Sequence, residues 1–145
     1  MTGVLVLAAA LVVATAVGLW LRRAPRKLAA GRSAPSAPAD ERLALGPADL
    51  GVPLGERATL VQFSSAFCAP CRATRRILTD VTETVPGVAY VDIDAESHLD
   101  LVRRLDVRRT PTVLVLDAEG HLVRRASGQP RKVDVIAALG NAVSP

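Results

Sequence analysis

The stretch Phe67-Cys68-Ala69-Pro70-Cys71 decides how the rest of this chain is interpreted. The two cysteines of the chain stand three positions apart, directly after a short apolar, β-prone run at residues 59–63. Residues 68–85 then carry apolar side chains at helical spacing. The two thiols are therefore expected at the start of a helix, on one face and close enough to bridge. Pro70 suits the first helical turn, where its missing N–H is not needed.

The start of a helix stabilises a thiolate. Backbone N–H groups of the first turn have no helical partner, and the helix dipole places positive charge there. We therefore expect Cys68 to be the attacking thiolate, because a stabilised thiolate reacts with disulfides at neutral pH and is also a good leaving group. Cys71 lies one turn further on and is expected to be more shielded. It would resolve a mixed disulfide by attacking Cys68.

A cysteine pair at this spacing is also half of many zinc sites. A closed site needs two more ligands, and only His98 and His121 remain, which are widely separated in the chain. We therefore expect no bound metal. The sequence has no glycine-rich phosphate loop, so it implies no nucleotide or flavin cofactor. The second alternative, two inert buried cysteines, is disfavoured by their position between a strand and a helix.

The remaining apolar runs alternate between strand and helix patterns. We expect further strands at residues 88–93, 112–116 and 122–123, with a turn at 118–121 before the last. A short helix is expected from an N-cap at Ser97 through Leu105. A final helix is expected over residues 133–143, with these apolar positions: Val133, Ile136, Ala137 and Leu139. This order predicts an α/β domain with a central mixed sheet and helices on its faces.

Four features together resemble the thioredoxin family over about residues 57–143. Residues 61–71 match the family's strand and active-site turn. Thr110-Pro111-Thr112 matches its cis-proline segment, residues 117–120 its hairpin turn, and Gly128 its glycine before the last helix. The resemblance implies the three-layer thioredoxin-like fold and thiol-disulfide exchange through a Cys68–Cys71 disulfide.

The resemblance also implies where a substrate binds. Thr110–Pro111 is expected to be cis, to pack against the cysteines and to pair through its backbone with an extended substrate segment; the alternative is an ordinary trans proline at a strand edge. The substrate-binding residues that it implies are Phe67, Ala69, Pro70, Thr110 and Pro111.

Three positions depart from the family pattern. Ala69 replaces the usual glycine between the cysteines, and Phe67 replaces the usual tryptophan, which keeps apolar cover but loses an indole N–H. Gln62 stands where typical thioredoxins bury an aspartate that assists proton transfer with the second cysteine. Because an amide cannot ionise, Gln62 either limits proton transfer to and from Cys71 or is a packed structural residue while water carries the proton.

The N-terminal part predicts a membrane anchor. Residues 3–21 contain no charged side chain, and a helix of this length reaches roughly 28 Å, about one hydrocarbon core. A cleaved secretion signal is the alternative, with residues 14–16 as a small-residue cleavage site, but no basic residue precedes the run. We expect an uncleaved anchor over residues 1–23 that contacts lipid through residues 3–21. A linker rich in Pro, Ala and Ser follows over 24–40, and the folded domain covers 41–145.

The charge distribution predicts sidedness. The whole chain has a formal net charge of +4, but residues 1–32 hold five basic side chains and no acid, which leaves −1 for residues 33–145. A basic cluster after the span places the N-terminus outside and the domain in the cytoplasm. The same split, with only 3% aromatic residues, argues against nucleic-acid binding.

We therefore expect a membrane-anchored thiol-disulfide oxidoreductase. Its partners would be a disulfide-containing protein substrate and an electron-donating reductase, neither of which the sequence identifies. In the cytoplasm, which keeps thiols reduced, it would reduce disulfides. The alternative is a peptide-binding or assembly module that uses the surface around Pro111 with little turnover.

Overall fold

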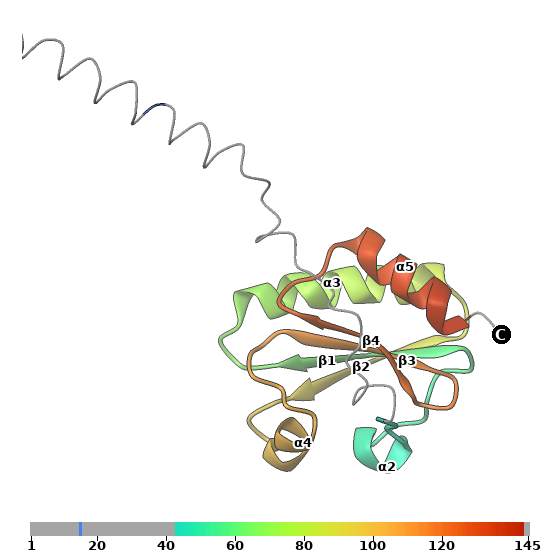
Figure 1. Cartoon of the computed structure of the whole chain (residues 1–145), viewed down its shortest axis with the longest axis horizontal. Coiled ribbons are helices and arrows are strands. Elements are labelled where there is room, and N and C mark those ends of the chain that lie inside the picture. The colour runs from blue at the N-terminus through green and yellow to red at the C-terminus, as the bar shows by residue number, and fades with distance from the viewer. Residues whose placement is uncertain (1–14, 16–42, 144–145) are drawn as a thin grey trace, which may run out of the picture. The chain divides into compact units, whose positions relative to one another are not determined.

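The computed structural model describes Thr15 and residues 43–143 (Figure 1). The chain divides into two units, Met1–Arg32 and Ser33–Pro145. Within the described residues, no helix is long and apolar enough to cross a membrane. Apart from Thr15, the expected anchor over residues 1–23 and the linker over 24–40 lie outside the described part of the chain.

The described elements follow the expected order of strands and helices, with one additional helix at the start. Their bounds are α2 (Pro47–Leu50), β1 (Ala58–Ser64), α3 (Ala69–Thr84), β2 (Val88–Asp94), α4 (Leu99–Arg104), β3 (Thr112–Asp117), β4 (Leu122–Ser127) and α5 (Lys132–Val143).

The four strands form a mixed sheet in the order β2-β1-β3-β4. Strand β1 is parallel to β2 and antiparallel to β3, and β3 is antiparallel to β4. Helices α3 and α5 cover one face of the sheet, while α2 and α4 lie against the other (Figure 1). This arrangement confirms the predicted three-layer α/β fold.

Strand β1 separates the two cores. All seven of its residues are buried, as is typical of a central strand covered on both faces. Its side chains alternate between the faces: Leu60 packs in the core under α3 and α5, while Val61 and Phe63 pack in the opposite core with Leu101 of α4. The end of this rigid strand leads directly to the cysteines.

The final helix buries a different stripe from the expected one. Of the four expected apolar positions, only Leu139 is buried; Val133 and Ile136 are 64% and 47% exposed, and Ala137 is exposed as well. The buried residues are Val135, Ala138, Leu139 and Ala142. These positions follow the i, i+3, i+4, i+7 spacing of one helical face, and α5 packs on α3 and β3. Helix α5 carries two apolar stripes, and contact with the rest of the domain selects one.

Two local expectations also differ from the structure. Ser97 does not cap α4, whose N-cap residue is His98. The Ser97 hydroxyl instead donates to Asp94 Oδ2 at 2.5 Å and so links the loop after β2 to the end of that strand. Helix α2 was not expected, although Gly46-Pro47 is a recognisable start: Pro47 occupies the first turn, and Asp49 Oδ2 accepts from the Gly46 N–H at 2.9 Å.

Candidate active site

The two cysteines lie at the N-terminus of α3, just beyond the end of β1. Cys68 is the N-cap residue, and its Sγ is bonded to Cys71 Sγ, with a Cα–Cα distance of 5.2 Å. The Cys71 N–H donates to Cys68 Sγ at 3.1 Å. Cys71 is 3% exposed, whereas Cys68 is only partly buried. The Cys68 sulfur is therefore the accessible one, and a backbone donor favours negative charge on it after reduction.

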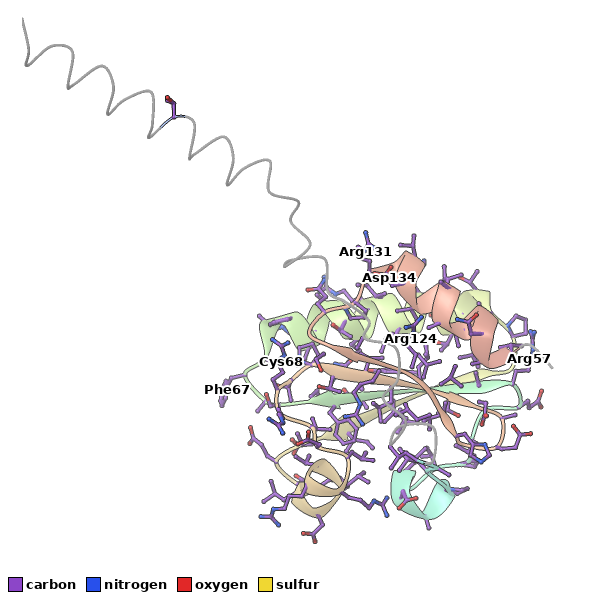
Figure 2. All side chains as sticks on the ribbon, viewed as in Figure 1. Arg57, Phe67, Cys68, Arg124, Arg131 and Asp134 are labelled. Carbon is purple, nitrogen blue, oxygen red and sulfur yellow. A yellow bond between two sulfur atoms is a disulfide. The ribbon has the colours of Figure 1, made fainter. Side chains whose placement is uncertain are left out.

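Phe67 projects away from the protein beside Cys68 (Figure 2). Its side chain is 99% exposed, so the expected apolar cover over the cysteines is not formed by this residue. Exposure of a phenyl ring to water is unfavourable, and contact with another apolar surface would lower the free energy. Ala69 and Pro70, at the start of α3, are also exposed.

The loop before β3 is tied to the segment that precedes Cys68. The Thr110–Pro111 peptide bond is cis, as the resemblance implies. Thr110 Oγ1 and Ser65 Oγ are hydrogen-bonded at 3.0 Å, and Ser65 O accepts from the Cys68 N–H at 3.3 Å. On the other side, the Gly128 N–H donates to Pro111 O at 2.7 Å. Residues 110–111 are thus fixed next to the turn that carries the cysteines.

Gln62 is fully buried, and each end of its amide makes one hydrogen bond. Its Nε2 donates to Cys71 O at 3.0 Å, and its Oε1 accepts from the Tyr90 hydroxyl at 3.0 Å. The side chain therefore connects β1 and β2 to the first turn of α3. These contacts favour a positioning role for Gln62, the second of the two alternatives that the sequence left open.

Tyr90 was not predicted as part of the site. Burial, followed by the charge of Asp92, raises its pKa to about 12, while Arg75 acts in the opposite direction. The phenol therefore remains a hydrogen-bond donor to Gln62 at any physiological pH. Strand alternation could have indicated this. Tyr90 is the register partner of Leu60, and Leu60 and Gln62 point to the same face of β1, so Tyr90 shares that face with Gln62.

A carboxylate lies next to Gln62 on the neighbouring strand. Asp92 is the register partner of Gln62, and it forms an ion pair with Arg75, one turn beyond Cys71 on α3. The Asp92 carboxylate raises the pKa of Arg75 further above its usual value. Asp92 Oδ1 is buried and has no hydrogen-bond partner among the described residues.

Neither of the two histidines interacts with a cysteine in the described part of the chain. His98 Nδ1 contacts Asp94 O at 3.0 Å. His121 forms an ion pair with Asp117 in the turn between β3 and β4, where the ligand atoms of Asp117, Glu119 and His121 lie within 4.8 Å of one another. Asp117 Oδ1 already accepts from the N–H groups of Glu119 and His121, so this cluster is accounted for as a turn.

A disulfide at a helix N-terminus, a mixed sheet behind it and an adjoining cis-proline loop define a dithiol domain of the thioredoxin-like class. A family model described as Thioredoxin matches residues 52–141. The chain is 29% identical over 87 residues to Thioredoxin H4-1 of Oryza sativa subsp. japonica, which covers 59% of this chain and 66% of that protein. It is 29% identical over 58 residues to a thioredoxin of Ophiophagus hannah, which covers 40% of this chain and 55% of that protein.

Solved structures agree on the fold. A mutant thioredoxin from Halobacterium salinarum NRC-1 superposes with a TM-score of 0.57 at 19% identity, covering 62% of this chain and 78% of that chain. A thioredoxin from Nicotiana alata gives 0.55 at 22% identity, with coverage of 61% and 76%. This chain belongs to the thioredoxin family. It spans less than two thirds of the length of the two curated relatives described above.

Proposed function

We propose that this protein is a thiol-disulfide oxidoreductase that reduces protein disulfides. The observation that carries the proposal is the asymmetric cysteine pair: a partly exposed Cys68, whose sulfur receives a backbone hydrogen bond, is bonded to a 3% exposed Cys71. Such asymmetry separates an attacking thiol from a resolving one. Membership of the thioredoxin family supports the same chemistry.

The reaction proceeds by two successive exchanges. The reduced Cys68 thiolate attacks one sulfur of a substrate disulfide, a Cys68–substrate disulfide forms, and the other substrate sulfur leaves as a thiolate that takes up a proton. Cys71 then loses its proton and attacks Cys68 Sγ. The first substrate sulfur leaves as a thiolate and is protonated in turn. The protein ends with the Cys68–Cys71 disulfide, and a separate reductase restores it with two electrons and two protons.

The surrounding residues have roles in binding and positioning. Phe67, Ala69 and Pro70 offer an exposed surface beside Cys68, and the fixed Thr110–Pro111 segment offers backbone groups to an extended substrate. Gln62 holds the first turn of α3 through Cys71 O. We assign no metal or organic cofactor to this reaction.

Reduction of insulin by the protein in the presence of a dithiol donor tests the proposal. The wild-type protein should accelerate insulin precipitation, and Cys68→Ser should abolish the effect. Cys71→Ser should accumulate a mixed disulfide through Cys68, visible on a non-reducing gel. A wild-type protein with no turnover that binds insulin peptides as well as the Cys68→Ser variant does would identify a binding module instead.

We also propose that residues 3–21 anchor the protein in a membrane with the domain in the cytoplasm. The charge-free run and the five basic residues that follow it before position 33 support this placement. An alkaline phosphatase fused after Pro145 should be inactive in bacterial cells, because this reporter folds only outside the cytoplasm. An active fusion would overturn the proposed sidedness. A mature chain that begins near Gly18 in mass spectrometry would overturn the anchor.

A further inference from the structure

Exposed cationic side chains without ion-pair partners lie next to the cysteines. Five arginines of the domain are neutralised by an ion pair with an aspartate: Arg75, Arg103, Arg104, Arg108 and Arg131. Arg72 and Arg109 are exposed, and neither forms an ion pair or side-chain hydrogen bond with another described residue. Their positions are set by the two segments that build the site, residues 65–72 and 109–111, which together we call the dithiol face.

Arg72 belongs to the first turns of α3. Its backbone N–H donates to Cys68 O at 3.4 Å, so it stands four residues after Cys68 on the same side of the helix. Side chains of a helix lean toward its N-terminus, which directs Arg72 back over the turn that carries the cysteines. Arg76 follows four residues later and extends the positive charge along the exposed side of α3.

Arg109 approaches the cysteines from the loop before β3. It immediately precedes Thr110, whose hydroxyl is bonded to Ser65 at 3.0 Å. Its own carbonyl accepts from Thr112 Oγ1 at 2.7 Å, which fixes the Arg109 backbone at the start of β3. A substrate segment that pairs with residues 110–111 would therefore pass next to position 109, which carries an exposed arginine.

Two acids without an ion pair in the described part of the chain, Asp94 and Glu96, lie on the other side of β1 from β3. Asp94 ends β2 and Glu96 lies in the loop that follows, and this loop is joined to the end of β1 by the Ala95 N–H donating to Ser64 O at 2.9 Å. The Ser97 hydroxyl and the Glu96 N–H hold the pKa of Asp94 below its usual range, so Asp94 is charged. In the strand order β2-β1-β3, the turn after β1 separates these acids from Arg109. The dithiol face itself thus carries Arg72 and Arg109 and no acidic residue.

We propose that the dithiol face selects acidic substrates: extended protein segments that carry Asp or Glu next to the cysteine that Cys68 attacks. This inference rests on the proposed oxidoreductase function and specifies its substrate class. Opposite charges at an exposed site attract weakly, so each Arg–carboxylate contact should favour an acidic peptide by roughly two- to fivefold. The preference should weaken as salt screens the charges.

The test measures a single exchange step, so that it does not depend on complete turnover. In a Cys71→Ser background, Cys68 attacks the peptide sulfur of three peptide–pyridyl disulfides, which carry Glu, Gln or Lys on both sides of the cysteine. The peptide–pyridyl S–S bond breaks, pyridine-2-thione leaves, and its absorbance gives the second-order rate constant. The ratio between peptides is the readout, because any change in Cys68 reactivity affects all three alike.

The rate constant should be highest for the Glu peptide, intermediate for Gln and lowest for Lys. The ratios between them should fall toward one as salt is raised from about 0.02 M to about 1 M. Arg109→Glu and Arg72→Glu should each reduce or reverse the order. Arg57→Glu is the matched control, because Arg57 is also exposed and without an ion pair in the described structure, but it precedes β1 and lies at the opposite end of the sheet from Cys68 (Figure 2).

Equal rate constants for the three peptides would overturn the proposal. An Arg57→Glu effect as large as that of Arg109→Glu would also overturn it, because net charge rather than the dithiol face would then set the preference. Failure of the wild-type protein to reduce insulin would contradict the oxidoreductase function separately, whatever the peptide ratios.

Discussion

Replacing Gln62 with aspartate should convert a neutral buried anchor into an ionisable group beside Cys71. The amide now donates to Cys71 O and accepts from the Tyr90 hydroxyl, both at 3.0 Å. A carboxylate keeps an acceptor for Tyr90 but has no donor for the Cys71 carbonyl. Protonation would supply one. Burial, the facing carbonyl and the neighbouring Asp92 all raise the pKa of a carboxyl at this position, and we expect them to outweigh the single donor from Tyr90.

The raised pKa fixes the sign of the stability change. A carboxyl whose folded-state pKa exceeds its unfolded value of about 3.9 is most favourable below that value, and its contribution is lost as pH rises toward the folded pKa. Each unit of difference between the folded and the unfolded pKa removes about 1.4 kcal/mol from the free energy of unfolding. A rise of about two units would make Gln62→Asp about 2.7 kcal/mol less stable at about pH 8 than at about pH 3, beyond any pH dependence of the wild type.

Gln62→Asn is the matched control, since asparagine has the same length as aspartate but does not ionise. Both variants should lose roughly 1–3 kcal/mol through poorer hydrogen bonds to Cys71 and Tyr90. Only the aspartate should add a pH-dependent loss. Urea unfolding of the oxidised proteins across the pH range measures both quantities, and parallel pH profiles for the two variants would refute the expected pKa.

The same variants test proton transfer. A carboxylate can accept the proton that Cys71 must lose before it attacks the mixed disulfide, and an amide cannot. Gln62→Asp should therefore speed the decay of a preformed Cys68 mixed disulfide by about tenfold or more once the carboxyl is ionised. Single-turnover rates from about pH 6 to about pH 9 provide the measurement. If the wild-type, Asp and Asn proteins resolve at the same rate at every pH, Gln62 is a structural residue only.

Three further predictions concern the fold. Tyr90→Phe should cost roughly 1–3 kcal/mol in urea unfolding, because it leaves the buried Gln62 Oε1 without its donor; an unchanged unfolding midpoint would show that this bond is dispensable. Leu139→Ala should cost about 2–5 kcal/mol, whereas Ile136→Ala, at a position 47% exposed on the same helix, should cost much less; equal losses would contradict the assigned face of α5. Gly120→Ala should lower the free energy of unfolding by more than about 1 kcal/mol, because Gly120 has φ +88° and an added Cβ would lie 2.2 Å from Leu45 O. A variant that unfolds at the same temperature as the wild type would contradict this.

Features that depend on residues close together in the chain could be predicted from the sequence. Pro70 after a strand indicates a helix start, because the preference of proline for the first helical turn is local. The strand β1 and the hairpin turn at Gly120 follow from apolar patterning and turn chemistry in the same way. Errors were also local in origin: Ser97 is a good N-cap residue, but Asp94 lies close enough to engage its hydroxyl first.

The environment of the cysteines required the tertiary structure. Gln62 and Tyr90 are 28 positions apart, and only the parallel register of β1 and β2 brings the phenol to the amide.

The buried face of α5 also required the tertiary structure. The composition of α5 allowed two apolar stripes, and packing on α3 and β3 determined which one is buried.

The sequence by itself determined the reactive group: two thiols at a helix start, after a central strand, with no carboxylate at position 62. Only the tertiary structure decided what surrounds that group. The Ser65–Thr110 hydrogen bond holds the loop that carries Arg109 against the turn before Cys68, and β1 lies between β3 and the strand that ends at Asp94. The physical reason is that a thiolate at a helix terminus depends on a few neighbouring peptide groups, whereas contacts between distant segments depend on strand order and register, which no local pattern encodes.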